Sequence, residues 1–387
     1  MEVSLKSPKR PEILLNFRGF RKILELLLKL TALPLIPRHF WCFKFQILVV
    51  PHFFIFTIIS SLWCIFYGSV ASGETTLTFY SIVVLVAHVQ VLAKILTYIW
   101  NRKEVRDFLD WFEGFYSIKE KDNKIEKIFE DQLSWSLNVS KMCFRAMLMA
   151  YGSTCISMII FLLYKGDAFI YRFPFSPDNP SQVHLGLLHL FQSLGLFFNT
   201  FFVVAGDLWV AIIGIHIMGM LRVLADFIRL LDESSQNHSS LLRRIQTLHA
   251  DIINHNRIFN DLIFHLLTAQ LLSSIFLILM SLSAVKYDAV GFVSYFLGGS
   301  SIIQLLLICL FGEIIFMRYS DIDRCLNLTK WYEMTLADQR NFILILRMGQ
   351  KPYGLKAGGM YDVSMPTFID IVKLAISYCA ILFAFIE

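Results

Sequence analysis

The chain has 387 residues, of which 56% are hydrophobic, 17% are charged and 36 are phenylalanine, and its formal net charge is +5. A soluble domain carries roughly 25% charged residues, so this composition argues against a soluble protein. The basic excess does not require a nucleic-acid partner, because lysines and arginines gather in segments where anionic lipid would attract them.

The N-terminal segment, residues 1–42, contains an amphipathic pattern. One helical face between Phe17 and Leu30 is apolar and comprises Phe17, Phe20, Ile23, Leu24, Leu27 and Leu28. The opposite face carries Arg18, Arg21, Lys22 and Glu25. Two placements are open: the helix lies on the inner leaflet of a membrane, or it packs on the protein's own cytoplasmic part. We expect no cleavable signal sequence, because this segment lacks an early apolar stretch and a small-residue cleavage site.

Long apolar segments follow, and each has the roughly 20 residues that a helix needs to cross a bilayer. They lie at about 43–67, 74–100, 134–164, 186–217, 262–285, 291–317 and 363–386. The longer ones should tilt or project into water. The sequence therefore predicts an all-α membrane protein with seven transmembrane helices, and a soluble all-α protein with buried helices is the less favoured alternative.

The distribution of lysine and arginine predicts the orientation of these spans. The segments before, between and after the first six spans carry 9, 0, 7, 2, 5, 1 and 7 of them in chain order. This alternation predicts a cytoplasmic N-terminus and, with seven spans, an extracellular C-terminus. A G-protein-coupled receptor has the opposite orientation. The sequons at Asn138, Asn237 and Asn327 then lie at or near the cytoplasmic side, so we expect none of them to be glycosylated.

The second, fourth and sixth loops are long and helical in pattern. Apolar residues recur at helical spacing from Leu241 onwards, so the fourth and fifth spans should continue inward as helices. The sixth loop has apolar side chains to bury, namely Leu328, Trp331, Tyr332, Leu336, Phe342, Ile345 and Leu346. Such a surface outside the membrane needs a partner, either the neighbouring loops or another subunit. We therefore assign residues 43–317 to six spans with cytoplasmic helical extensions, and 318–362 to further cytoplasmic helices, which are called the anchor helices below.

Ionisable residues are rare inside the predicted spans. Asp370 and Lys373 are three residues apart in the last span, so they share a helical face and could pair. An unpaired lysine at the bilayer centre costs about 2.5–3.5 kcal/mol, so Lys373 should face protein, a carboxylate or water. Asp207 is another intramembrane acid, placed to cap a polar cluster. Three histidines of the outer half, His88, His184 and His189, are interpreted as packing residues.

The sequence contains no G-x-S-x-G, H-E-x-x-H or Walker-type motif, so we expect no enzymatic activity. Its seven cysteines form no CxxC or Cys/His cluster. We therefore expect no metal, no cofactor and no disulfide framework.

The C-terminal part carries a set of spaced residues: Ser320, Trp331, Tyr332, Arg347, Gln350, Lys351, Pro352, Leu355, Ala357, Gly358, Ser364, Phe368, Val372, Lys373, Ala375, Ser377 and Tyr378. This set resembles the C-terminal signature of insect odorant receptors. Weaker similarities occur upstream at Asp207, His216, Leu221 and His255. The chain departs from the signature at Tyr319, where an acidic residue is common, and no tyrosine follows Ser320 at the usual distance.

The resemblance implies a ligand-gated, non-selective cation channel in the plasma membrane of olfactory neuron dendrites. Such channels are tetramers, usually of a tuning subunit with an obligate co-receptor, and their ligands are small volatile odorants. The anchor helices would hold the subunits together through Trp331, Tyr332 and Arg347. The last span, residues 363–387, would line the pore. Its pore-lining residues would be Lys373 and Ala384, and its gate would be formed by Ile381 and Phe385.

The resemblance also favours a tuning subunit, since Ala384 stands where the co-receptor has a polar pore residue and the fourth loop lacks the co-receptor's insertion. It implies an odorant pocket in the outer half of the bundle, between spans two, three, four and six. The candidate residues there are Phe79, Tyr80, Tyr151, Gly195, Phe198 and Tyr295. Dispersion and aromatic contact would hold a small apolar ligand, although aromatic residues at helical spacing are also typical of an ordinary core.

Two alternatives stay open. A gustatory receptor shares the topology, and the spacing from Tyr378 to Phe385 is similar to that family's tail. The lack of a glutamine at 384 and the Lys-Pro and Ala-Gly pairs favour the odorant branch instead. A transporter would predict an internal repeat and spans broken at the midplane, and the sequence shows no such repeat.

Overall fold

The computed structural model describes residues 10–31, 55–67, 75–165, 181–233, 238–286, 292–350, 353–359 and 361–385. Helices dominate this part of the chain. They are α1 (Arg10–Thr31), the helix Ile55–Tyr67, α3 (Thr75–Trp100), α4 (Arg102–Ser117), α5 (Asn123–Lys165), α6 (Gln182–Glu233), α7 (His238–Lys286), α8 (Phe292–Leu328), the 3₁₀ helix η2 (Trp331–Glu333), α9 (Leu336–Gly349) and α10 (Met365–Phe385). A two-stranded antiparallel hairpin, β1 (Lys356–Ala357) with β2 (Tyr361–Asp362), precedes α10.

Five of the described helices are long and apolar enough to cross a membrane, namely α3, α5, α6, α7 and α8. They coincide with the predicted second to sixth spans, and α10 coincides with the predicted seventh. The first predicted span, 43–67, is helical from Ile55 to Tyr67, and its earlier part lies outside the described residues. The prediction of an all-α membrane protein is thus confirmed, whereas the number and orientation of the crossings stay predictions.

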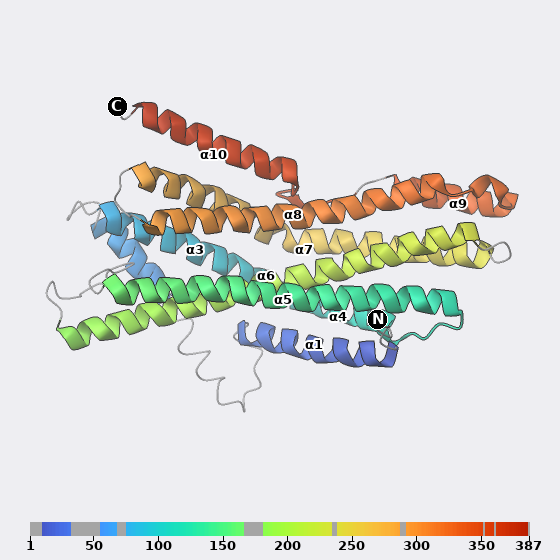
Figure 1. Cartoon of the computed structure of the whole chain (residues 1–387), viewed down its shortest axis with the longest axis horizontal. Helices are drawn as coiled ribbons and strands as arrows, with labels where there is room; N and C mark the ends of the chain where they lie inside the picture. Colours follow the sequence, from blue (N-terminus) through green and yellow to red (C-terminus); the bar gives the residue numbers. More distant parts are fainter. Residues whose placement is uncertain are drawn as a thin grey trace, which may run out of the picture.

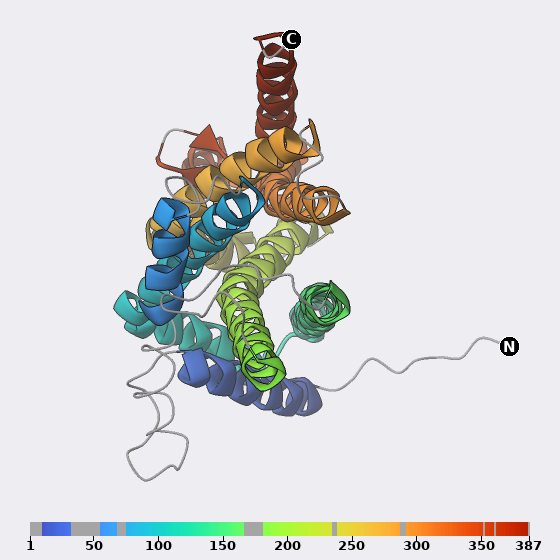
Figure 2. The same ribbon diagram turned by 90° about the vertical axis from the view of Figure 1, so that its left-hand side faces the viewer.

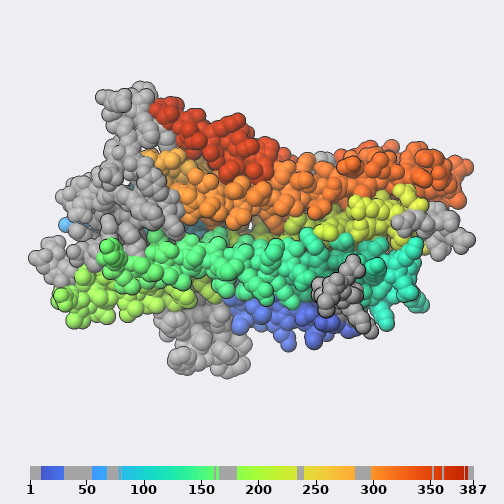
Figure 3. Space-filling model, viewed as in Figure 1, coloured from blue at the N-terminus to red at the C-terminus, as the bar shows by residue number. Residues whose placement is uncertain are grey.

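The long helices α5, α6, α7 and α8 run side by side along the long axis of the molecule (Figure 1). At one end of this axis α8 leads into η2 and α9, beyond the part of the bundle flanked by α10. α10 diverges from the other helices, which an end-on view makes plain (Figure 2). In the space-filling view it forms a ridge above α8, while α5 and α1 cover the lower part of the same face (Figure 3).

α6 is the central helix, and 83% of its most apolar window is buried. Three glycines allow neighbouring helices to approach it closely. A Cβ atom at Gly206 would lie 2.8 Å from the Lys94 Cβ of α3, and one at Gly214 would lie 2.1 Å from the Phe311 ring of α8. A Cβ atom at Gly219 would lie 1.9 Å from a serine hydroxyl of α5. Small residues at these points are typical of tightly packed membrane helices.

The N-terminal amphipathic helix packs on the protein itself, in agreement with one of the two placements considered above. Its buried face comprises Ile13, Phe17, Phe20, Leu24 and Leu28. The Phe17 ring stacks on that of Tyr116 with centroids 4.2 Å apart. α1 begins at Arg10 rather than at Phe17, and Ile23, predicted on the apolar face, is 51% exposed. At about 100° per residue, its position lies beyond the edge of the buried stripe.

Ion pairs and a buried hydroxyl group also contribute to the surface on which α1 packs. The Arg21 guanidinium forms ion pairs with Glu25, Asp110 and Glu113 at 2.6–2.7 Å. Burial raises the pKa of the Tyr116 hydroxyl far above its ordinary value, so this group stays protonated. It donates to the Leu133 carbonyl oxygen at 3.2 Å. The contact surface between α1 and the bundle therefore has apolar stacking at its centre and ion pairs at its edge.

Candidate functional site

The residues predicted to contact an odorant are distributed over four helices, and the structure describes four of their side chains. Phe79 is buried near the start of α3, Tyr151 is half-buried on α5, and Gly195 and Phe198 are half-buried on α6. Phe198 packs on an apolar cluster around Val91. Tyr80 and Tyr295 belong to α3 and α8, but their side chains lie outside the described residues. The helices α3, α5 and α8 all pack on α6.

A polar cluster joins these same helices inside the bundle. Lys94 of α3, only 1% exposed, forms an ion pair with Asp207 of α6, with Nζ and Oδ1 2.7 Å apart. The Tyr151 hydroxyl of α5 donates to the other carboxylate oxygen at 2.8 Å. The Gln304 side chain of α8 lies near the Tyr151 hydroxyl. The prediction that Asp207 caps a polar cluster agrees with this geometry.

The cluster depends on the close approach of α3 and α6. Since Gly206 has no side chain, the Lys94 stem crosses α6 in van der Waals contact and its ammonium group reaches Asp207. Each buried charge stabilises the other, because either one alone would have lost its hydration without an opposite charge to offset that loss. The sequence analysis missed Lys94 and Gln304, although a lone lysine inside a predicted span was a usable signal.

The hairpin before α10 is fixed to α7. Asn260 donates from its side-chain amide to the Gly354 carbonyl oxygen at 3.0 Å and accepts from the Lys356 N–H at 3.2 Å. Thr268 accepts from the Gly358 N–H at 2.9 Å. Gly358 has a φ of 60°, a left-handed conformation that favours glycine. Two residues of the family-like signature are buried here, Leu355 just before the hairpin and Ala357 in β1, so these two positions serve to pack the turn on the bundle.

The start of α10 is fixed to α8 by two consecutive residues. A Cβ atom at Gly312 would lie 1.9 Å from the Val363 carbonyl oxygen, so the helix touches backbone there. The Glu313 carboxylate accepts from the Met365 N–H, the first residue of α10, at 3.1 Å. The Val363 N–H in turn donates to the Leu355 carbonyl oxygen at 2.9 Å. The base of α10 is thus tied to both α7 and α8.

Beyond its base, α10 exposes most of its surface. Its exposed large apolar side chains are Ile369, Leu374, Ile376, Tyr378 and Ile381. Asp370 and Lys373 are both exposed, and no ion pair joins them in the described part of the chain, so the suggested pairing is not found. The reason is that a three-residue spacing permits contact but does not impose it. The side chains of Ala384 and Phe385 lie outside the described residues.

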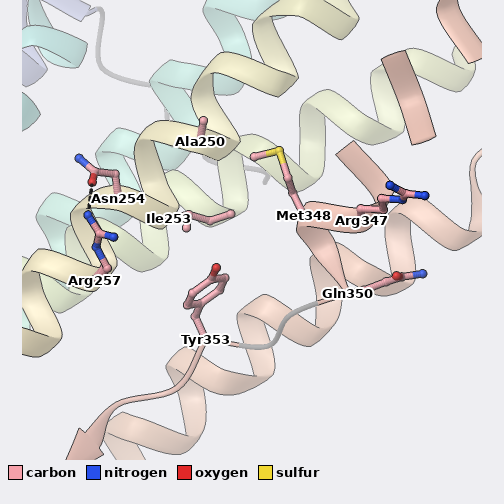
Figure 4. A pocket seen from close by; sticks show the side chains of 8 residues that line it. All are labelled: Ala250, Ile253, Asn254, Arg257, Arg347, Met348, Gln350 and Tyr353. Atoms are coloured by element: carbon pink, nitrogen blue, oxygen red, sulfur yellow. Dashed lines mark hydrogen bonds between the residues drawn. The ribbon is translucent and has the colours of Figure 1, made fainter. Parts of the chain in front are cut away.

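The region predicted to anchor subunits has both a buried and an exposed part. Phe342 and Ile345 of α9 are buried against the bundle. Trp331 and Tyr332 of η2 and Leu336 of α9 are exposed. Arg347 lies on one wall of a groove of about 830 Å³ between α7 and α9. Arg257 lies on its opposite wall, with apolar side chains and Tyr353 between them (Figure 4).

Comparison with known proteins agrees with this architecture. The sequence model of the seven-transmembrane odorant receptors matches residues 74–376. The chain belongs to the insect odorant receptor family. Odorant receptors are multi-pass membrane channel proteins of olfaction and not enzymes, so the expectations of family and of no enzymatic activity are confirmed. The gustatory receptor and transporter alternatives are thereby set aside.

Individual odorant receptors show the same relationship. The putative odorant receptor 83c of Drosophila melanogaster is 23% identical over 145 residues, 38% of this chain and 36% of that protein. Odorant receptor 49a of the same organism is 25% identical over 307 residues, 75% of this chain and 76% of that protein. The solved structure of the insect olfactory receptor OR5 from Machilis hrabei matches with a TM-score of 0.72 at 13% identity, covering 95% of this chain and 98% of that one. Its complex with eugenol matches with a TM-score of 0.72 at 12% identity, covering 96% and 99%.

Proposed function

We propose that this odorant receptor is a tuning subunit of an odorant-gated, non-selective cation channel, which it forms as a heterotetramer with a co-receptor. The observation that carries the proposal is the exposed surface of α10. An apolar helix that diverges from its own bundle requires partners on its other sides, and copies of α10 from neighbouring subunits would provide them around a central pore. Membership in the odorant receptor family supports this reading.

The pore would be lined by residues 363–387 of each subunit. Ile381, which is 54% exposed, and Phe385 would form the apolar gate, because an apolar constriction excludes ions by dewetting. Lys373 is exposed on the same helix, so it would face water or a neighbouring subunit rather than lipid. Ala384 would leave the mouth of the pore more apolar than a polar residue would.

The anchor would be formed by residues 318–362, through Trp331, Tyr332 and Arg347. The apolar side chains of η2 and of the start of α9 are exposed in the isolated subunit, which supports a subunit contact there. Residues 1–42 would lie in the cytoplasm with α1 on the bundle, and residues 43–317 would form the first six spans. This orientation rests on the lysine and arginine distribution.

The odorant would bind among α3, α5, α6 and α8, near Phe79, Tyr80, Tyr151, Gly195, Phe198 and Tyr295. The similar OR5 structure with eugenol supports a small, partly aromatic ligand. Aromatic contacts and one hydrogen bond suffice for ligands of this class. A ligand that prefers the open arrangement would shift the channel toward it, by no more than its differential affinity for the two states.

Whole-cell recording tests the proposal. The chain is expressed with and without an insect co-receptor, its surface level is measured, and the cells receive a panel of small volatiles. We expect a non-selective cation current only in co-expressing cells and for one class of odorant. A current from this chain alone would contradict the tuning role, and silence in both at normal surface level would contradict the channel assignment.

A further inference from the structure

The junction between α8 and α10 assigns a specific task to Glu313, and this inference rests on the proposed channel function. The first four N–H groups of a helix have no partner within it. α10 has no acidic residue in its first turn, and its second residue, Pro366, has no N–H. The Glu313 carboxylate of α8 accepts from the Met365 N–H at 3.1 Å. It therefore brings a negative charge to the positive end of the α10 dipole from another helix.

The neighbouring residue makes this contact close. Gly312 leaves no room for a side chain against the Val363 carbonyl oxygen, so α8 lies directly on the backbone that enters α10. The hairpin just before it is tied to α7 through Asn260 and Thr268. Between these fixed points, the carboxylate is a side-chain hydrogen-bonding link from α8 to the first turn of α10.

The same helix also reaches the polar cluster of the bundle. Gln304, whose side chain lies near Tyr151, stands nine residues before Glu313 on α8. At a rise of about 1.5 Å per residue the two lie about 14 Å apart along one uninterrupted helix. One continuous helix, with no loop between, therefore connects the neighbourhood of Tyr151 with the base of α10.

We propose that Glu313 is a positioning residue that couples α8 to the pore helix. Its carboxylate makes the first turn of α10 follow α8, so that a ligand-induced shift of α8 changes the orientation of α10. Glu313 does not contact the odorant or the gate, and it acts only through Met365.

Three variants separate this coupling from a merely structural cap. Glu313→Ala removes the acceptor and the charge, and Glu313→Gln keeps an acceptor without the charge. Asp321→Asn is the matched control, because Asp321 is an acidic residue of the same helix that pairs only locally with Arg318. We expect the odorant-evoked current per surface receptor to fall roughly threefold to tenfold in E313A and less in E313Q. Wild-type evoked current in E313A at normal surface level would overturn the inference.

A rescue variant tests whether the carboxylate must belong to α8 or can instead belong to the chain that enters α10. Ser364→Asp places a carboxylate just before α10, on the chain of α10 itself, where aspartate caps as well as serine. In the double variant E313A/S364D we expect the start of α10 to regain stability while the evoked current stays low. Full recovery of the current would show that Glu313 only caps the helix, and would refute the coupling.

Hydrogen–deuterium exchange of the purified protein gives a readout that needs no current. We expect the peptide covering residues 361–372 to exchange faster in E313A than in the wild type or in D321N, and to be protected again in E313A/S364D. Unchanged exchange in E313A would overturn the inference even if the wild-type chain carried no current. A silent wild type with altered exchange in E313A would instead contradict the proposed channel function and leave the α8–α10 link in place.

Discussion

Lys94 and Asp207 form an ion pair inside the helix bundle, with Nζ and Oδ1 2.7 Å apart and the lysine almost completely buried. The pair joins α3 to α6, and the Tyr151 hydroxyl extends it to α5. Because the Lys94 side chain is almost completely buried and that of Asp207 is only 13% exposed, the pair should act as a unit in both stability and assembly.

Breaking that unit on one side is predicted to be costly. Lys94→Met leaves the Asp207 carboxylate without its cation and should destabilise the protein by about 3–5 kcal/mol. The double variant Lys94→Met/Asp207→Leu removes both charges and should recover most of this loss. Thermal unfolding in detergent measures the effect, with Lys22→Met on the exposed side of α1 as the control. Equal stability of K94M and the wild type would contradict the prediction.

Tyr151 offers a milder change in the same cluster. Tyr151→Phe removes only the hydroxyl that donates to Asp207, so a loss of about 1.5–3 kcal/mol is expected for a bond to a charged group. Tyr164→Phe is the matched control, because Tyr164 is exposed at the far end of the same helix. Tyr151→Ala should additionally shift odorant sensitivity while assembly persists. Unchanged dose–response curves at normal surface level would remove Tyr151 from the ligand contacts.

The predicted gate can be tested through the basal current of the channel. Phe385→Ala shortens an apolar side chain at the proposed constriction, so basal current without odorant should rise. Ile376→Ala is the control, since residue 376 is also exposed on α10 but points to a different side of it than residue 381. The measurement is current before odorant, normalised to surface receptor. A basal current equal to that of the wild type would remove Phe385 from the gate.

The exposed anchor surface should be needed for assembly. Tyr332→Ala and Leu336→Ser each remove apolar area that the isolated subunit leaves uncovered. We expect the amount of co-purified co-receptor to fall at least about fivefold, since central apolar contacts contribute 1 kcal/mol or more. Leu15→Ser, on the exposed face of α1, should leave it unchanged. Normal co-purification of both anchor variants would place the subunit contact elsewhere.

Two glycines of α8, one at the junction with α10 and one away from it, allow a controlled test of how tightly the two helices pack. Gly312→Ala forces a methyl group against the Val363 carbonyl oxygen and should cost about 1–3 kcal/mol by overpacking. Gly299→Ala meets nothing within 4 Å and should be neutral or slightly stabilising. Thermal unfolding and odorant-evoked current, measured for both variants, test whether G312A is more disruptive than G299A. Similar behaviour of both would mean that α8 and the start of α10 separate easily.

The long spans could be predicted from the sequence because a run of about 20 apolar residues has few other outcomes. The placement of α1 could not, since one amphipathic stripe fits a lipid surface and a protein surface equally well. Lys94 and Gln304 were missed because helical spacing tells which face a residue occupies, not which residue of another helix stands opposite. Their contacts with Asp207 and Tyr151 depend on Gly206 and on the packing of α3, α5 and α8 around α6. The hairpin was not predicted, since its two-residue strands carry no pattern of their own.

The close contacts of α6 also set an order of events during synthesis. Its neighbours at Gly206 and Gly219 belong to α3 and α5, which leave the ribosome before α6 does, whereas Phe311, which covers Gly214, belongs to α8 and emerges later. Two of the three contacts can therefore form as soon as α6 has been inserted. The third side of α6 is covered only after α8 has been made, so an incomplete bundle that can already hold the Lys94–Asp207 pair precedes the packing of Phe311 on Gly214.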